Sequence, residues 1–243
     1  MSDGATMTTG VILPSYNAAR FLPAVIADIR RVDPEARILV VDDGSADGTD
    51  EAAAAAGVEV RIHPENRGKG AALATGFAWA VESGMDWVYT MDADGQHRPE
   101  EMPDLMARAL ADDLDVVVGN RMQAREGMPW LREQTNLFTS WVVSRLAGVA
   151  IPDSQNGYRL FRTRYLDGLV LRTARYDTES EVLVRLARRG ARIGSAPVST
   201  VYGEETSSIR PLLDTIRFFK LVARLLTDRE PRRPTPTGGP TRS

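Results

Sequence analysis

The segment whose residues indicate a chemical function most specifically is YTMDADGQH, residues 89–97. An apolar run ends there in Asp92 and Asp94, two carboxylates separated by one residue, with Gln96 close behind. Such side chains at a strand end point the same way, and their charges repel unless a cation lies between them. Mg²⁺ and Mn²⁺ prefer oxygen ligands of this kind. The spacing predicts a divalent-metal site. The alternative is a polar loop that caps the helix expected near Pro99.

Two other polar segments also follow apolar runs. Ser15, Tyr16 and Asn17 come after GVILP, and DDGSADGT (42–49) comes after RILVV. Turn-forming residues explain the end of the second segment, but they do not require two adjacent acids at its start. One acid, Asp43 by preference, suits a nucleoside hydroxyl or a base edge. Ser15 and Tyr16 are placed to pack against that base.

The segment NRGKGAA, residues 66–72, places Lys69 between two glycines at the expected start of a helix. Backbone N–H groups at a helix start, together with an ammonium, favour an anion such as phosphate. The alternative for this segment is a solvated loop.

Composition limits the classes of protein that this chain can represent. The 243 residues are 43% hydrophobic and 26% charged, which suits a globular protein with ample core. We expect one domain over residues 1–228 and a disordered Pro- and Arg-rich tail over 229–243. The net charge of −3 gives no basic field for nucleic acid. The absence of cysteine excludes disulfides, thiolate nucleophiles and Cys-ligated zinc.

The cellular location is predicted from two kinds of segment, signal peptides and membrane-spanning helices. The first ten residues lack the basic start and apolar core of a signal peptide. No run approaches the roughly 20 apolar residues that a spanning helix needs. We therefore expect a cytoplasmic protein, either free or peripheral on the cytoplasmic membrane face.

Alternating patterns in the sequence predict the strands and helices that position the polar clusters. Apolar, β-branched runs predict strands at 10–14, 37–43, 58–62, 87–92 and 115–119, and helical spacing predicts helices at 22–29, 49–57, 69–84 and 99–113. This order predicts an α/β fold with a mostly parallel sheet covered on both faces. Ligands bind beyond the carboxyl ends of such strands, which is where the polar clusters fall. The second half predicts helices near 131–147 and 178–190 and a loop and strand at 153–161.

The segment IRPLLDTIRFFKLVARLL, residues 209–226, predicts a C-terminal amphipathic helix. One broad face carries Leu212, Leu213, Ile216, Phe219, Val222, Ala223 and Leu226, and Arg210, Arg217 and Arg224 lie opposite. Basic and apolar faces of this kind suit the surface of an anionic bilayer. Docking onto the domain or onto a second subunit gives the same pattern. The oligomeric state stays open, with a homo-oligomer among the alternatives.

Six motifs, in order, connect these clusters to a known family. They are PSYNAARFLPAVI, VVDDGSADGT, NRGKGAAL, MDADGQHRPEEM, GNRM and DSQNGYRLFR. The chain resembles an inverting glycosyltransferase of family 2, and within that family the polyprenyl-phosphate mannosyl- and glucosyltransferases of the dolichyl-phosphate mannose synthase type. The resemblance implies a GT-A fold. It also implies metal-dependent transfer of a hexose from a nucleoside-diphosphate sugar, of the GDP-mannose or UDP-glucose type, to a polyprenyl phosphate.

The resemblance assigns roles by position. It implies that Pro14, Tyr16 and Asp43 hold the nucleoside, that Asp92, Asp94 and Gln96 bind Mg²⁺ or Mn²⁺, and that Arg121 and Arg132 engage the phosphates. Guanidinium groups suit phosphate because they donate in a planar pair. We add Asn17, Lys69 and Asp92 to the expected nucleotide-sugar site. Related synthases often carry an acidic residue where this chain has Ala18, and a lysine in the acceptor loop where Ser208 stands.

The acceptor side has two interpretations. A sugar hydroxyl needs a general base, for which Asp153 is the first candidate, with Glu179 and Asp177 behind it. A lipid phosphate, whose second pKa is about 6, needs no base. Turn and helix capping are the alternative roles for Asp153 and Glu179. Arg159 is expected to meet the acceptor phosphate or to pair with a carboxylate.

Two functions other than lipid-phosphate transfer therefore remain open. One is transfer to a sugar hydroxyl of a glycan or small molecule, and the other is a non-catalytic sugar-nucleotide-binding protein.

Overall fold

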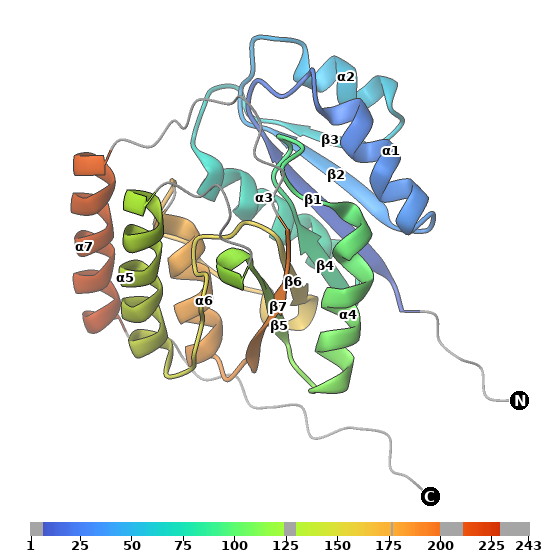
Figure 1. Cartoon of the computed structure of the whole chain (residues 1–243). Coiled ribbons are helices and arrows are strands. Elements are labelled where there is room, and N and C mark those ends of the chain that lie inside the picture. The colour runs from blue at the N-terminus through green and yellow to red at the C-terminus, as the bar shows by residue number, and fades with distance from the viewer. Residues whose placement is uncertain (1–6, 124–129, 176, 200–210, 229–243) are drawn as a thin grey trace, which may run out of the picture.

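A computed structural model describes residues 7–123, 130–175, 177–199 and 211–228. Within them, seven strands form one sheet in the order β3-β2-β1-β4-β6-β5-β7, with helices on both faces (Figure 1). Only β6 runs antiparallel to its neighbours β4 and β5, and the other pairs are parallel. This confirms the predicted mostly parallel α/β sheet.

The bounds of the strands agree closely with the predicted runs in the first half of the chain. The strands are β1 Thr9–Ser15, β2 Arg37–Asp42, β3 Glu59–Ile62, β4 Trp87–Thr90, β5 Val116–Asn120, β6 Arg159–Arg162 and β7 Ile193–Pro197. The helices are α1 Leu22–Val32, α2 Thr49–Ala55, α3 Lys69–Glu82, α4 Met102–Ala111, α5 Trp130–Ala147, α6 Asp177–Arg188 and α7 Pro211–Thr227, with short 3-10 turns at Pro99–Glu101, Arg121–Gln123 and Thr163–Tyr165. Strand β7 was not predicted because its sequence, IGSAP, has little β propensity.

Two hydrophobic clusters hold the helices against the sheet, because successive strand residues point to opposite faces. Val11 and Leu13 pack with α1, α2 and α4 on one face. Ile12, between them, packs with α3, α5, α6 and α7 on the other face. Both clusters are enclosed at the central strands, where Val11, Ile12 and Leu13 of β1 are 0% exposed. The carboxyl ends of β1, β2 and β4 are therefore fixed side by side at one edge of a rigid sheet.

Helix α7 packs on the domain through a stripe of residues next to the predicted apolar face. Phe218, Leu221 and Leu225 are buried against the domain, whereas Phe219 is 53% exposed and Leu226 is 69% exposed. Of the alternatives for the predicted apolar face, docking onto the domain does not hold for Phe219 and Leu226, because the helix presents a neighbouring stripe to the core. In the part of the chain that the structure describes, no helix is long and apolar enough to cross a bilayer.

Several sequence predictions concern residues outside the described ranges. These are the side chains of Leu212, Leu213 and Ile216, the Ser208 and Arg210 positions, and the tail 229–243.

Candidate functional site

The polar clusters predicted from the sequence meet at one edge of the sheet. Pro14 and Ser15 end β1, Asp42 pairs in register beside Ser15, and Asp92 follows β4. Strands β1 and β4 are parallel neighbours, so their carboxyl ends lie together. The sheet topology thus gathers the polar clusters at the edge where a crevice was expected.

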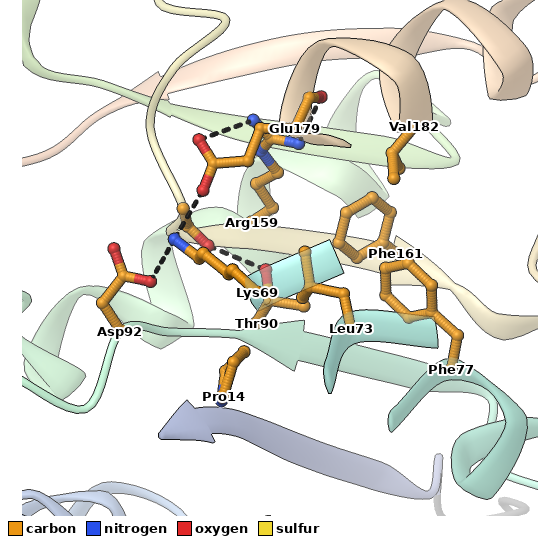
Figure 2. A pocket seen from close by; sticks show the side chains of 11 residues that line it. Pro14, Lys69, Leu73, Phe77, Thr90, Asp92, Arg159, Phe161, Glu179 and Val182 are labelled. Carbon is orange, nitrogen blue, oxygen red and sulfur yellow. Dashed lines mark hydrogen bonds and ion pairs between the residues drawn. The ribbon is translucent and has the colours of Figure 1, made fainter. Parts of the chain in front are cut away.

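The centre of this edge is the ammonium of Lys69, which reaches over from the start of α3 (Figure 2). Its Nζ lies 2.5 Å from Asp92 Oδ1 and 2.6 Å from Glu179 Oε1. Glu179 comes from the first turn of α6, and its side chain is 4% exposed. One cation therefore bridges a carboxylate from the sheet edge and a carboxylate from the second half of the chain.

The protonation of this group follows from its surroundings. Burial alone lowers the pKa of the Lys69 ammonium, but the charges of Asp92 and Glu179 outweigh burial and raise it above its usual value. Burial alone raises the pKa of Asp92, but the charges of Lys69 and His97 lower it well below its usual range. Both groups are therefore ionised at neutral pH.

Gly157 lets the chain pass directly over this ion pair. A Cβ at this position would lie 2.8 and 2.9 Å from the two Asp92 oxygens and 2.9 Å from Lys69 Nζ. The Thr90 hydroxyl, at the end of β4, donates a hydrogen bond of 2.8 Å to the Gly157 carbonyl. The glycine of the QNGY segment is thus required by close approach, a role that the sequence did not reveal.

Asp94 carries the second charge of the predicted metal pair. Burial and the neighbouring charge of Asp92 raise the pKa of Asp94, and the Gln96 N–H donates to Asp94 Oδ1 at 2.9 Å. Two acids that repel each other, with an amide oxygen in the same turn, fit a hard divalent cation. Among the described residues, no group of three or more His, Asp or Glu is placed to hold a metal. Such an ion would therefore complete its shell with water or with a bound ligand.

His97 lies beside this acidic pair, and its side chain is only 4% exposed. Its Nε2 lies 3.5 Å from Asp92 Oδ2, and its Nδ1 has no hydrogen-bond partner in the structure. The ring packs against Tyr158 with centroids 5.2 Å apart. The imidazole thus approaches Oδ2 of Asp92, whereas Lys69 contacts Oδ1.

Asp43 has a different role from the predicted contact with a nucleoside. Its carboxylate accepts hydrogen bonds from His63 Nδ1 at 2.7 Å, from the Arg67 N–H at 3.0 Å and from the Gly68 N–H at 2.6 Å. His63 is itself fixed by a 2.9 Å contact of Nε2 with the Thr75 hydroxyl. In this structure Asp43 holds the loop that leads into α3. His63 is the partner of Asp43 that the sequence did not reveal, because no motif includes it.

The predicted anion site at the start of α3 is not open. The Gly68 N–H donates to Asp43, and the Gly70 N–H donates to the Ala174 carbonyl at 3.0 Å. The N–H groups of both glycines of the GKG motif therefore have partners within the protein. The Lys69 side chain is the charged group that the helix start presents to the site.

Tyr16 and Asn17 follow β1 at the rim of the site. Tyr16 is 54% exposed, so its ring is available to stack on a base. Asn17 adopts a left-handed conformation with φ of 53°. Its N–H donates to Ser45 Oγ at 2.8 Å, and its side-chain oxygen accepts the Ala46 N–H at 3.0 Å. Asn17 therefore joins the loops that follow β1 and β2 and contributes to the site through their shape.

Arg121 and Asp153 form a buried bidentate pair. Arg121 Nε and Nη2 lie 2.8 and 3.1 Å from the two oxygens of Asp153, and Asn136 Nδ2 donates to the same carboxylate at 2.8 Å. Burial alone raises the pKa of Asp153, but these partners lower it. A carboxylate held in this way is a weak base. Arg132 lies in α5, but its side chain is outside the described residues.

The Arg159 guanidinium also forms its hydrogen bonds within the protein. It is 2% exposed, and its guanidinium donates to the carbonyls of Asn156, Glu179 and Ser154 at 2.7, 2.8 and 2.9 Å. Of the two roles expected for Arg159, the structure shows the pairing with a carboxylate, because its Nη2 lies 3.7 Å from Glu179 Oε2. Arg159 thereby joins β6, the preceding loop and the first turn of α6.

Residues 10–169 match the sequence profile of glycosyl transferase family 2. The chain is 33% identical to an undecaprenyl-phosphate mannosyltransferase of Micrococcus luteus, over 79% of this chain and 83% of that protein. It is 36% identical to a polyprenol monophosphomannose synthase of Mycolicibacterium smegmatis, over 68% of this chain and 66% of that protein.

The fold is also similar to that of a solved structure. Glucosyl-3-phosphoglycerate synthase from Mycobacterium tuberculosis, crystallised with Mn²⁺, uridine diphosphate and glucosyl-3-phosphoglycerate, superposes with a TM-score of 0.65 at 20% identity, over 95% of this chain and 82% of that one.

Proposed function

The chain belongs to glycosyl transferase family 2, and from that premise we propose that it transfers a hexose from a nucleoside-diphosphate sugar to the phosphate of a polyprenyl phosphate. Glycosyltransferase activity follows from the family. The acceptor is supported by two relatives named for undecaprenyl-phosphate mannosyl transfer and for polyprenol monophosphomannose synthesis.

The observation that carries this proposal is that both leading acceptor-side carboxylates are already neutralised by cations. Asp153 is paired with Arg121, and Glu179 is paired with Lys69. Transfer to a sugar hydroxyl needs a carboxylate free to accept its proton. A phosphate acceptor brings its own negative charge and needs none. The arrangement therefore favours the phosphate acceptor over the hydroxyl acceptor.

Asp177 is the remaining candidate base. Burial raises its pKa, and the charges that act on it are those of Glu181 and Arg217. Arg217 lies in α7 and Glu181 lies in α6, so the charges that act on Asp177 belong to the helices. The charged groups at the sheet edge, in contrast, pair with one another, because Lys69 contacts Asp92 and Glu179. We assign Asp177 no part in the transfer.

On the donor side we assign Asp92, Asp94 and Gln96 to Mg²⁺ or Mn²⁺. The raised pKa of Asp94 and the oxygen-only donor set support this assignment. When bound, such an ion neutralises charge on a departing diphosphate. Lys69 adds a second positive charge beside Asp92, at the junction of donor and acceptor sides, and the exposed ring of Tyr16 offers a stacking surface to the base.

The proposal is tested by transfer to a pair of matched lipids. Purified protein is incubated with Mn²⁺, with UDP-glucose or GDP-mannose, and with a short polyprenyl phosphate or the corresponding polyprenol in detergent. We expect hexose to appear on the phosphate and not on the alcohol. The rate should fall as the acceptor phosphate protonates, near its second pKa of about 6. Lipid-linked hexose and released nucleoside diphosphate are measured by mass spectrometry.

Two results would contradict this assignment in different ways. Transfer to polyprenol or to a glycan hydroxyl, with loss of that activity in Asp177→Asn, would establish the hydroxyl acceptor. Binding of the donor without transfer or hydrolysis would indicate the non-catalytic protein.

A lipid acceptor also requires a surface that approaches a bilayer, and we assign it to the outer sides of α5 and α7. Phe138 and Trp141 on α5 are 48% and 63% exposed, and Phe219 on α7 is 53% exposed. The Phe138 ring lies 6.4 Å from the rings of both Trp141 and Phe219. Figure 1 shows these two helices side by side at one end of the molecule. Exposed aromatic rings gathered in this way are typical of membrane-surface binding.

Vesicle flotation tests this surface. We expect the protein to float with vesicles that contain phosphatidylglycerol. Replacing Phe138, Trp141 and Phe219 together by Ser should weaken that binding at least about tenfold, since each large side chain contributes about 1.5–3 kcal/mol on full burial. Leu110→Ser is the control, because Leu110 is 49% exposed on α4, on the other face of the sheet. Wild-type protein that stays wholly in solution would exclude peripheral binding.

A further inference from the structure

Glu181 is a buried carboxylate that none of the assigned functions uses. It lies in α6 and is 0% exposed. It accepts hydrogen bonds from the Arg172 N–H at 3.0 Å, from the Thr173 N–H at 2.8 Å, from the Thr173 hydroxyl at 2.6 Å and from Arg185 Nε at 2.7 Å. Three of these four donors belong to the segment 172–174, which precedes α6. The carboxylate therefore fixes the backbone of this segment.

The segment that Glu181 fixes packs directly on the start of α3. The Ala174 carbonyl accepts the Gly70 N–H at 3.0 Å. A Cβ on Gly70 would lie 2.6 Å from the Thr173 carbonyl oxygen, and a Cβ on Gly68 would lie 2.1 Å from the Ala174 carbonyl oxygen. Backbone thus lies against backbone on both sides of Lys69 in sequence. The two glycines of the GKG motif are explained by this contact, without an anion.

The start of α3 is therefore held from two directions. Asp43 binds the Arg67 and Gly68 N–H groups on one side, and the segment 172–174 binds the Gly70 N–H on the other. Lys69 lies between these attachments, and its Nζ meets Asp92 at 2.5 Å and Glu179 at 2.6 Å.

We propose that Glu181 is a positioning residue for Lys69: its carboxylate holds residues 172–174 against the start of α3 and thereby sets where the ammonium meets Asp92. This inference rests on the proposed function, in which Lys69 stabilises charge between donor and acceptor. Glu181 touches neither Lys69 nor the sheet-edge acids, so its effect passes through the backbone of the segment.

Glutamine cannot take the place of Glu181. The carboxylate faces four donor groups and offers only acceptors, whereas an amide replaces one oxygen by two N–H groups. At least one donor from residues 172–174 or from Arg185 then faces an N–H instead of an oxygen. E181Q is nearly the same size as the wild-type side chain, so it weakens this hydrogen-bond network without opening a cavity.

The test is a double-mutant cycle with K69M, measured as kcat and KM for transfer to polyprenyl phosphate. We expect E181Q to lower kcat by about 10- to 100-fold, as a small misplacement of a charged group does, and to change the donor KM far less. K69M should lower kcat at least as much. In the double variant, E181Q should add little further loss, because its effect passes through Lys69.

The control is D115N. Asp115 is 0% exposed and paired with Arg164 at 3.0 Å, but it immediately precedes β5, at the opposite edge of the sheet. D115N removes a buried carboxylate as E181Q does, so it should lower thermal stability. Its effect on kcat should be independent of Lys69, so the variant that carries both D115N and K69M should lose the product of the two single losses in kcat. Active-site titration by donor binding corrects each kcat for any unfolded fraction.

The outcomes separate this inference from the proposed function. If E181Q and K69M act independently, or if K69M keeps the wild-type kcat, Glu181 does not act through Lys69. A crystal structure of E181Q gives a readout that needs no activity. It should show Lys69 Nζ displaced from its contact with Asp92, and an unmoved ammonium overturns the inference even if transfer to the lipid phosphate is observed. Absence of transfer by the wild-type protein would contradict only the proposed function.

Discussion

Replacement of Asp94 by Asn is expected to lower the rate of hexosyl transfer by about a hundredfold or more, the loss typical when a group that stabilises the developing charge is removed. Asn keeps the shape of the side chain and its contact with the Gln96 N–H, but it removes the charge that would hold the cation. The Mn²⁺-dependent part of the thermal stabilisation by donor should disappear as well, because a ligand stabilises the fold in proportion to its binding.

The same variant should not destabilise the free protein. Burial and the charge of Asp92 raise the pKa of Asp94, so the charge of Asp94 lowers the stability of the folded state relative to the unfolded state. Asn removes that repulsion, and the metal-free protein should unfold at the same or a higher temperature. Asp104→Asn is the control, since Asp104 is an exposed acid in the first turn of α4. If Asp94→Asn keeps the full Mn²⁺-dependent shift, the metal assignment is wrong.

Replacement of Asp153 by Asn is expected to reduce stability and donor binding together. The change leaves the Arg121 guanidinium, whose side chain is 18% exposed, without its carboxylate partner. Breaking a buried pair by removing one partner costs about 3–5 kcal/mol. A released Arg121 should also contact donor phosphate less well. Chemical denaturation and donor titration measure the two effects.

The pH dependence distinguishes this anchoring role from a role as base. The pKa of Asp153 is lowered in the folded state, so its pair stabilises the protein above the unfolded-state pKa of about 4, and that contribution is lost as the pH falls further. Asp153→Asn should lack this acid-dependent part of the unfolding curve. In an Arg121→Met background, the Asp153 change should have little further effect on donor binding. A variant that binds donor normally, folds stably and only fails to turn over would instead identify Asp153 as the base.

The sheet could be predicted from the sequence because the patterns that indicate its strands and helices are local. The β-branched runs of β1, β2, β4 and β5 and the helical spacing of α1 require no knowledge of distant residues. The carboxyl ends of parallel strands must meet, so the gathering of Tyr16, Asp43 and Asp92 at one edge also followed from the pattern. Strand β7 was missed because its stability comes from pairing with β5 and not from its own residues.

The roles of individual polar side chains depended on partners far away in the sequence. Lys69 and Glu179 are separated by 110 residues, and Arg121 and Asp153 by 32. Spacing along the chain shows which charges exist, but only the packed structure shows which charge neutralises which. For this reason the sequence assigned Asp43 to a nucleoside and left Arg159 between an acceptor phosphate and a carboxylate, whereas in the structure both side chains bind groups of the protein.

The α/β architecture, the family and the acidic pair at the end of β4 can be identified from the sequence, because each depends on adjacent or regularly spaced residues. The pairing of the acceptor-side carboxylates with cations and the backbone contact behind Lys69 depend on tertiary packing. Those features arise where the second half of the chain folds back over the sheet edge, since the free energy of a buried charge is set by the groups packed around it.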